Sequence, residues 1–174
     1  MREDRWRREA AEAIAAARRI AVLGIGNSGK GDDGAGLAAA AALKKKLSPS
    51  QRRRVRVLIG GPAPENLTGK IRALRPGLVV VLDAALGGRA PGSIFRVEPG
   101  KIADDGVTTH QISLRLLVRY IEESIDCPVL VLGIEPKSMG EGEKLSAAAE
   151  KGISSAVGFL VENLVRPGRR PPPA

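Results

Sequence analysis

The sequence predicts an α/β protein, a three-layer α/β/α sandwich around a mostly parallel sheet. Short, almost continuously apolar segments recur along the chain and alternate with longer segments of helical periodicity. Such apolar segments are typical of strands that helices cover on both faces. The chain of 174 residues is long enough for one domain with a core and too short for two ordinary ones. We therefore expect one domain over residues 1–166 and a disordered Pro/Arg-rich tail over 167–174.

The predicted elements follow one another as helix, then strand and helix in alternation. The predicted helices cover residues 2–18, 34–47, 64–74, 109–124 and 146–165. The predicted strands cover residues 19–26, 54–60, 77–84, 93–99 and 128–136. In the first helix, Trp6, Ala10, Ile14 and Ala17 have the spacing of one buried face. Residues 85–92 are too few for a crossover helix, so the strand over 93–99 need not be parallel to its neighbours.

The composition is that of a globular protein, with 43% apolar and 27% charged residues. No apolar run approaches the roughly 20 residues of a membrane span, and the first residues, MREDRWRREA, do not have the pattern of a signal peptide. Cys127 is the single cysteine, which excludes an intrachain disulfide. We expect a cytoplasmic monomer that does not bind membranes.

The chain is basic, with a formal net charge of +9. Such a charge is compatible with nucleic-acid binding or with a solvated surface. The basic residues are scattered, and none of the four aromatic residues lies in the basic runs 44–46 or 52–54. A single-strand binder would use such aromatic side chains for stacking. We therefore expect solvated surface charge and no nucleic-acid partner, and binding to arbitrary DNA remains the alternative.

The segment LGIGNSGKGDDGAG, residues 23–36, contains two phosphate-binding patterns and completes neither. Three glycines, Gly24, Gly26 and Gly29, form the dinucleotide fingerprint, but no acidic residue ends the second predicted strand to bind ribose. Gly24, Gly29 and Lys30 also match the G-x-x-x-x-G-K of a P-loop, but the next residue is glycine rather than Ser or Thr. A Rossmann-like nucleotide-binding protein is therefore the weaker alternative.

Two aspartates, Asp32 and Asp33, stand at the start of the helix that follows this segment, where they would repel a phosphate. We expect no nucleotide here. A purely structural interpretation makes the aspartates N-cap residues and the glycines a turn.

Asp83 directly follows the apolar run LVVVL, and His110, the single histidine, begins a predicted helix. Ligands of parallel α/β sheets bind beyond the carboxyl ends of the strands. Asp32 or Asp33, Asp83 and His110 are all expected at that edge, and carboxylates with an imidazole suit a divalent ion such as nickel or zinc. Each residue also has a structural interpretation, as a cap, a loop contact or a helix residue without function.

Five segments together resemble the nickel-iron hydrogenase maturation endopeptidases, most closely the branch that serves formate-hydrogenlyase-type hydrogenases. These segments are GIGNSGKGDDGAG, GGPAPENLTGKIRALRP, VVVLDAALGGRAPGSI, TTHQISLRLL and LGIEPKS, in that order. The resemblance implies a phosphorylase/hydrolase-like fold whose five-stranded mixed sheet has an antiparallel fourth strand. It assigns the metal-contacting and catalytic roles to Asp33, Asp83 and His110 and leaves Asp32 as an expected cap. Ser28, Gly29 and Lys30 depart from the apolar residues common in the family, and the basic first helix has no counterpart that we can place.

The resemblance also implies the reaction. Such enzymes remove a C-terminal extension from the precursor of the hydrogenase large subunit, and nickel already bound in the precursor is the recognition element. The enzyme stores no metal, although zinc or cadmium could occupy the site in vitro. Water activated by Asp33 or Asp83, or polarised by the metal, is the expected nucleophile, and Cys127 is expected to be an inert core residue. A non-catalytic nickel-checking or chaperone module for the same precursor is the alternative.

Overall fold

The computed structural model describes residues 2–98 and 109–165, with side chains over 5–98 and 114–164. The predicted tail over 167–174 lies outside this range. The helices are α1 (Arg2–Ala16), α2 (Ala35–Lys46), α3 (Gln51–Arg54), α4 (Thr68–Leu74), α5 (Thr109–Ile125) and α6 (Ala147–Val165), with 3₁₀ turns η1 (Gly31–Gly34) and η2 (Pro64–Leu67). The strands are β1 (Ile20–Ile25), β2 (Val55–Gly61), β3 (Leu78–Ala84), β4 (Ile94–Val97) and β5 (Val129–Ile134).

The described strands form one five-stranded mixed sheet in the order β2-β1-β3-β5-β4. The pairs β2–β1, β1–β3 and β3–β5 are parallel, whereas β4 is antiparallel to β5. Ile94 of β4 lies opposite Ile134 of β5. The antiparallel fourth strand that the resemblance implied is therefore confirmed.

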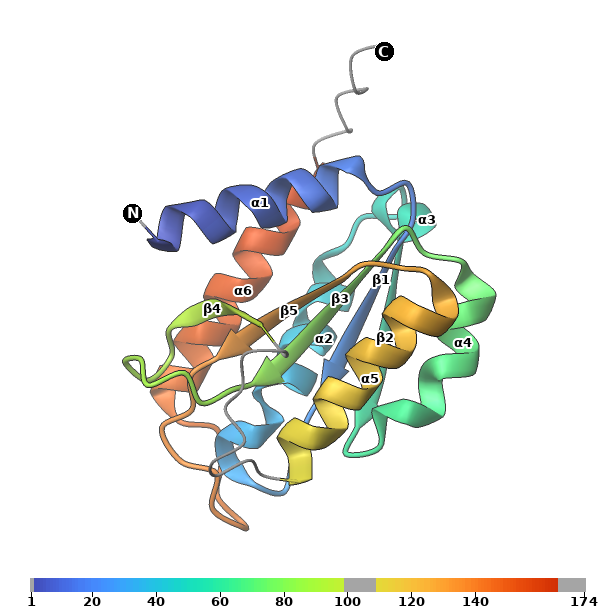
Figure 1. The fold of residues 1–174 in the computed structure, drawn as a ribbon. Coiled ribbons are helices and arrows are strands. Elements are labelled where there is room, and N and C mark those ends of the chain that lie inside the picture. Colours follow the sequence, from blue (N-terminus) through green and yellow to red (C-terminus); the bar gives the residue numbers. More distant parts are fainter. Residues whose placement is uncertain (1, 99–108, 166–174) are drawn as a thin grey trace.

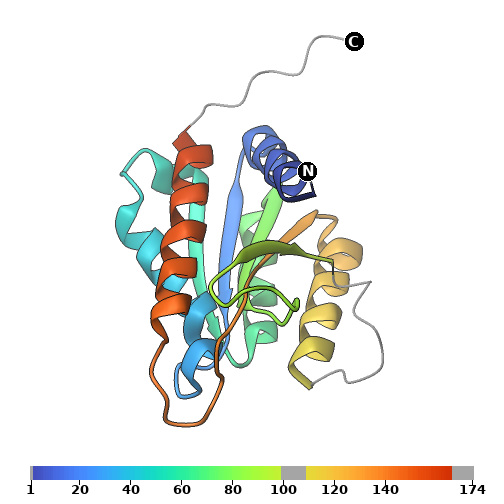
Figure 2. The same cartoon turned by 90° about the vertical axis from the view of Figure 1, so that its left-hand side faces the viewer.

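Helices cover both faces of the sheet (Figures 1 and 2), which confirms the three-layer prediction. Alternate residues of β1 supply the two cores, as the two-residue period of a strand requires. Ile20 and Val22 pack in the core beneath α1, α2 and α6, whereas Ala21 and Leu23 pack in the core beneath α4 and α5. All six residues of β1 are buried, as expected of a parallel strand with helices on both faces.

The first helix packs on the molecule through the face that its spacing predicted. Trp6, Ala10, Ile14 and Ala17 are all buried in the same core as residues of α6. The Trp6 ring lies 5.5 Å from the Phe159 ring of α6, measured between centroids. Burial of these side chains is what holds α1 against the rest of the fold.

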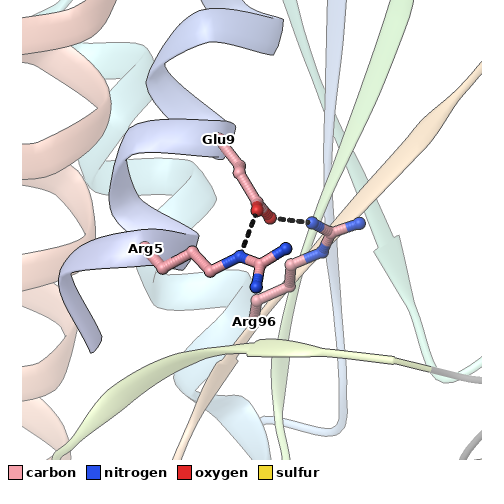
Figure 3. Close-up of polar contacts among 3 residues, drawn as sticks. All are labelled: Arg5, Glu9 and Arg96. Atoms are coloured by element: carbon pink, nitrogen blue, oxygen red, sulfur yellow. Dashed lines mark hydrogen bonds and ion pairs between the residues drawn. The ribbon is translucent and has the colours of Figure 1, made fainter. Parts of the chain in front are cut away.

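An exposed ion-pair network also joins α1 to β4. The Glu9 carboxylate accepts from Arg5 Nε at 2.8 Å and from Arg96 Nη1 at 3.1 Å (Figure 3). The Arg5 hydrogen bond is the main cause of the lowered pKa of Glu9. Pairs this exposed contribute little to stability, so the apolar face of α1 is the larger contribution.

At the amino edge of the sheet, Cys127 is buried as predicted, and burial raises the pKa of its thiol. A thiol in this state is a poor nucleophile because the thiolate is disfavoured. No helix in the described part of the chain is long and apolar enough to cross a membrane.

Candidate functional site

Glycines place the start of η1 directly against the sheet at the carboxyl end of β1. Gly26, which directly follows β1, has a φ of 125°, and a Cβ on it would lie 1.9 Å from the carbonyl oxygen of Asp33. A Cβ on Gly36 would lie 2.2 Å from the carbonyl oxygen of Leu82 in β3. Only glycine permits these approaches. These glycines therefore serve a tight turn and close packing, which brings the residues of η1 next to β3.

Two of the predicted site residues, Asp33 and Asp83, are buried at this edge. Asp33 lies in η1 and is 9% exposed, and Asp83 lies near the end of β3 and is 2% exposed. The segment η1 contacts β3 directly. Burial of carboxylates is costly unless they are hydrogen-bonded or bind a cation, so a pair of them at one sheet edge is typical of functional sites.

The third predicted residue, His110, lies in the first turn of α5. That helix begins near the carboxyl edge of the sheet and runs back to the amino edge, where β5 starts (Figure 1). Its backbone is thus at the edge that carries Asp33 and Asp83, whereas its imidazole is outside the described side chains. Among the side chains that are described, no group of three potential metal ligands occurs. A third ligand would therefore have to come from outside the described side chains, and His110 is the one that the sequence predicts.

Asp32 is not the helix cap that the sequence suggested. Neither η1 nor α2 has a side-chain cap, and the residue that precedes α2 is Gly34. The Asp32 carboxylate instead reaches the loop between β5 and α6. Its Oδ2 accepts from the backbone N–H of Lys137 at 2.7 Å, that of Ser138 at 3.3 Å and the Ser146 hydroxyl at 2.8 Å, and its Oδ1 accepts from the Ser146 N–H at 2.7 Å.

These contacts change the acidity of Asp32 as well as its role. Burial raises the pKa of the carboxyl group, but the hydrogen bonds from Ser146, Lys137 and Ser138 outweigh it, and the net pKa is lowered. Asp32 is therefore a charged structural residue that holds two loops together. The cap interpretation failed because all its partners lie more than 100 residues away in the chain, and three of the four are backbone groups that any residue could supply.

In the glycine-rich segment over residues 23–36, four successive backbone N–H groups are bonded within the protein, which is not the arrangement of a phosphate-binding loop. Asn27 accepts from the N–H groups of Gly29 and Lys30 at 2.9 and 3.1 Å. The N–H of Gly31 donates to Glu143 and that of Asp32 to Ser138, at 3.2 and 2.9 Å. A phosphate-binding loop would direct such groups toward its ligand.

A further buried carboxylate, Glu135, escaped the sequence analysis. It follows β5 at the same edge, and its Oε2 accepts from the N–H of Gly87 at 2.8 Å. The loop after β3 is thereby attached to the loop after β5. The one signal in the sequence was an acidic residue directly after an apolar strand, the same signal that identified Asp83.

The fold and the buried carboxylates at this edge indicate an α/β enzyme. Comparison with solved structures shows which class of enzyme it is. A nickel-iron hydrogenase maturation protease, HycI, from Thermococcus kodakarensis KOD1 superposes with a TM-score of 0.81 at 31% identity, covering 91% of this chain and 99% of that one. The hydrogenase maturating endopeptidase HybD from E. coli superposes with a TM-score of 0.69 at 26% identity, covering 84% and 91%.

Sequence comparison gives the same answer. The hydrogenase 3 maturation protease of Escherichia coli K12 is 38% identical over 120 residues, which are 68% of this chain and 74% of that protein. The family model for the HycI hydrogenase maturation protease matches residues 37–163. The chain belongs to the hydrogenase maturation protease family and is an endopeptidase of the HycI type.

Proposed function

We propose that this endopeptidase removes the C-terminal extension from the precursor of a nickel-iron hydrogenase large subunit, and that nickel bound in the precursor is what it recognises. The observation that supports this most is the pair of buried carboxylates, Asp33 and Asp83, from adjoining segments at one sheet edge. With the imidazole of His110 they make a mixed oxygen and nitrogen donor set, which suits a borderline divalent ion.

The proposed reaction depends on how the precursor peptide is oriented at the site. The precursor brings its nickel to the three side chains, and coordination fixes the peptide beside the site, an effect that can contribute several kcal/mol. Asp33 and Asp83 are the candidate general bases for an attacking water. The buried Cys127 thiol lies at the opposite edge of the sheet and takes no part. The proposal places this reaction in the cytoplasm, where single cysteines stay reduced, and assigns it to a monomer.

The test compares cleavage of nickel-loaded and nickel-free precursor by the wild-type protein and by Asp33→Asn, Asp83→Asn and His110→Ala. We expect cleavage of the loaded precursor only, and turnover reduced by orders of magnitude in each variant, because each removes a ligand that orients the substrate. Product mass identifies the cleaved bond, and thermal melts show that each variant folds.

A matched control is Glu135→Gln, which removes the charge of another buried carboxylate at the same edge but keeps an oxygen for the Gly87 N–H. It should cleave at close to the wild-type rate. The proposal is wrong if nickel-free precursor is cut equally well or if His110→Ala keeps near-normal activity. Stable binding of loaded precursor without any cleavage would instead identify the nickel-checking module.

A further inference from the structure

Large apolar side chains are exposed on the two loops that border the candidate site. Leu86, three residues after Asp83, is 57% exposed, and Met139, in the loop after β5, is 39% exposed. Figure 1 shows that these loops leave the sheet at the same edge. The other large apolar side chains that are exposed in the described part of the chain are Ile59, Leu116 and Tyr120.

The loop that carries Leu86 is fixed in place. Its neighbour Gly87 donates to the buried Glu135 carboxylate at 2.8 Å, and a Cβ on Gly87 would lie 2.6 Å from the Phe95 ring. The Ala85 N–H donates to Ile134 at 3.1 Å. Backbone bonds of 2.8 and 2.9 Å also join Glu135 to Gly92 and Ser93 at the far end of this loop.

The loop that carries Met139 is fixed in a similar way. The residues before it, Lys137 and Ser138, donate their N–H groups to the buried Asp32 carboxylate. Further along, the Gly142 N–H donates to Gly29 at 2.8 Å. Each exposed apolar residue is therefore next to a backbone N–H that a buried carboxylate holds.

Exposed apolar side chains on fixed loops are suited to binding a partner, because little conformational entropy is lost when they are covered. We propose that Leu86 and Met139 form an apolar docking surface for the hydrogenase precursor, which contacts them with apolar side chains near its cleavage site. This inference rests on the proposed function. The occupant is the precursor rather than a second copy of this chain, because both loops leave the sheet at the edge that carries Asp33 and Asp83, and a second copy there would cover the site.

The experiment measures kcat and KM for cleavage of the nickel-loaded precursor by Leu86→Ser, Met139→Ser and the double variant. We expect KM to rise about tenfold in each single variant and further in the double variant, the size of effect typical of a central interface residue. The kcat should stay close to that of the wild-type protein, because neither side chain is among the proposed metal ligands. The conservative variants Leu86→Met and Met139→Leu should keep the wild-type KM.

Leu116→Ser is the matched control, since Leu116 is 59% exposed but lies on α5, outside both loops. It should leave KM unchanged. If the wild-type protein cleaves the precursor and the Leu86 and Met139 variants do so with unchanged KM, the docking surface is wrong and the proposed function stands. An equal rise in KM for Leu116→Ser would also overturn the docking surface. If the wild-type protein does not cleave the loaded precursor, both proposals fail.

Discussion

Asp32 and Asp33 are neighbours in the chain, yet they contact different parts of the molecule. Asp32 accepts four hydrogen bonds from the loop between β5 and α6. The backbone of Asp33 meanwhile closes the glycine turn, because its carbonyl accepts from the Asn27 N–H at 3.3 Å. Asp32 thus joins two loops, whereas Asp33 lies buried in the same 3₁₀ turn, which contacts β3, the strand of Asp83.

Asp32→Asn should destabilise the fold by about 1–3 kcal/mol. Asparagine offers one oxygen and one amide nitrogen, so at least one N–H or hydroxyl of the β5–α6 loop faces another donor. Denaturant unfolding at neutral pH measures this loss. Glu141→Gln is a suitable control, because the Glu141 carboxylate is exposed and pairs with Lys30 at 3.4 Å. If both variants unfold at the wild-type denaturant concentration, Asp32 does not have the structural role described.

The contribution of Asp32 should also depend on pH. Its pKa is lower in the folded protein than in the unfolded chain, where an aspartate has a pKa of about 3.9. The stability it contributes is therefore fully present above that value and is lost as pH falls through the folded-state pKa. The difference in unfolding free energy between wild type and Asp32→Asn should narrow below about pH 4. A constant difference from pH 7 to pH 3 would contradict the assignment.

The residue scale is also where prediction from the sequence was least complete. Asp83 could be recognised because a carboxylate directly after the apolar run LVVVL is unusual in a buried strand and therefore suggests a function. The hydrogen-bond partners of Asp32 and Glu135 could not be predicted, because they are mostly backbone N–H groups, which every residue except proline has. The Leu86 and Met139 side chains could not be recognised as exposed before the loops were placed.

At the scale of elements, Arg54, the last of the three arginines of α3, joins two helices that are far apart in the chain. Arg54 Nε and Nη2 donate to the carbonyl of Ala17, just past the end of α1, at 3.0 and 2.8 Å, and Nη2 also donates to that of Ile14. Its Nη1 donates to the Leu164 carbonyl near the end of α6 at 3.5 Å. A cation at helix C-termini satisfies carbonyls that have no partner within the helix and interacts well with the helix dipole.

Arg54→Met should reduce the free energy of unfolding by about 2 kcal/mol, because charge-assisted bonds to buried carbonyls are lost while the aliphatic stem is kept. Arg53→Met, at the exposed neighbouring position in α3, is the control and should have little effect. Chemical denaturation measures the free energy of unfolding of both variants. Equal stability of the two would show that the Arg54 hydrogen bonds do not add to the apolar packing of α1 and α6.

Most elements could be predicted from the sequence because their apolar patterns are strong. β1 has no polar side chain, β3 begins with the five apolar residues LVVVL, and α1 has a clear buried face. The short helix α3 and the 3₁₀ turn η1 were not predicted, since a four-residue element has too few positions to show a period, whereas η2 and α4 together fill the helix predicted over 64–74. Their conformation is set by the segments that they connect.

At the scale of the whole molecule, the two edges of the sheet differ in charge. The carboxyl edge carries buried Asp33, Asp83 and Glu135. The amino edge has an open depression of about 680 Å³ lined by Arg18, Arg19 and Arg75 and by no acidic residue. Under the proposed function, the carboxylates of the carboxyl edge can bind the metal of the substrate, whereas the arginines of the amino edge offer it no ligand.

The order of strands and helices along the chain also explains why the candidate site could be predicted to lie at the carboxyl edge of the sheet. Parallel strands all end at one edge, so residues that follow β1 and β3 must meet there, and a helix that leads back to β5 must start there. That argument predicts that Asp33, Asp83 and the start of α5 lie at the same edge, and it needs no measured distance between them. It does not give the geometry of the ligands, which depends on side-chain conformations that no sequence pattern encodes.

The measurement that tests the central claim most directly is a crystal structure of the protein soaked with nickel, zinc or cadmium. Our account predicts an ion at the carboxyl edge bound by at least two of the side chains of Asp33, Asp83 and His110, with ligand distances of about 2.0–2.2 Å for zinc. The same soak of Asp33→Asn should lose the ion or weaken its occupancy. Carboxylates and an imidazole too far apart to share one ion, or an ion bound only elsewhere on the surface, would contradict the account.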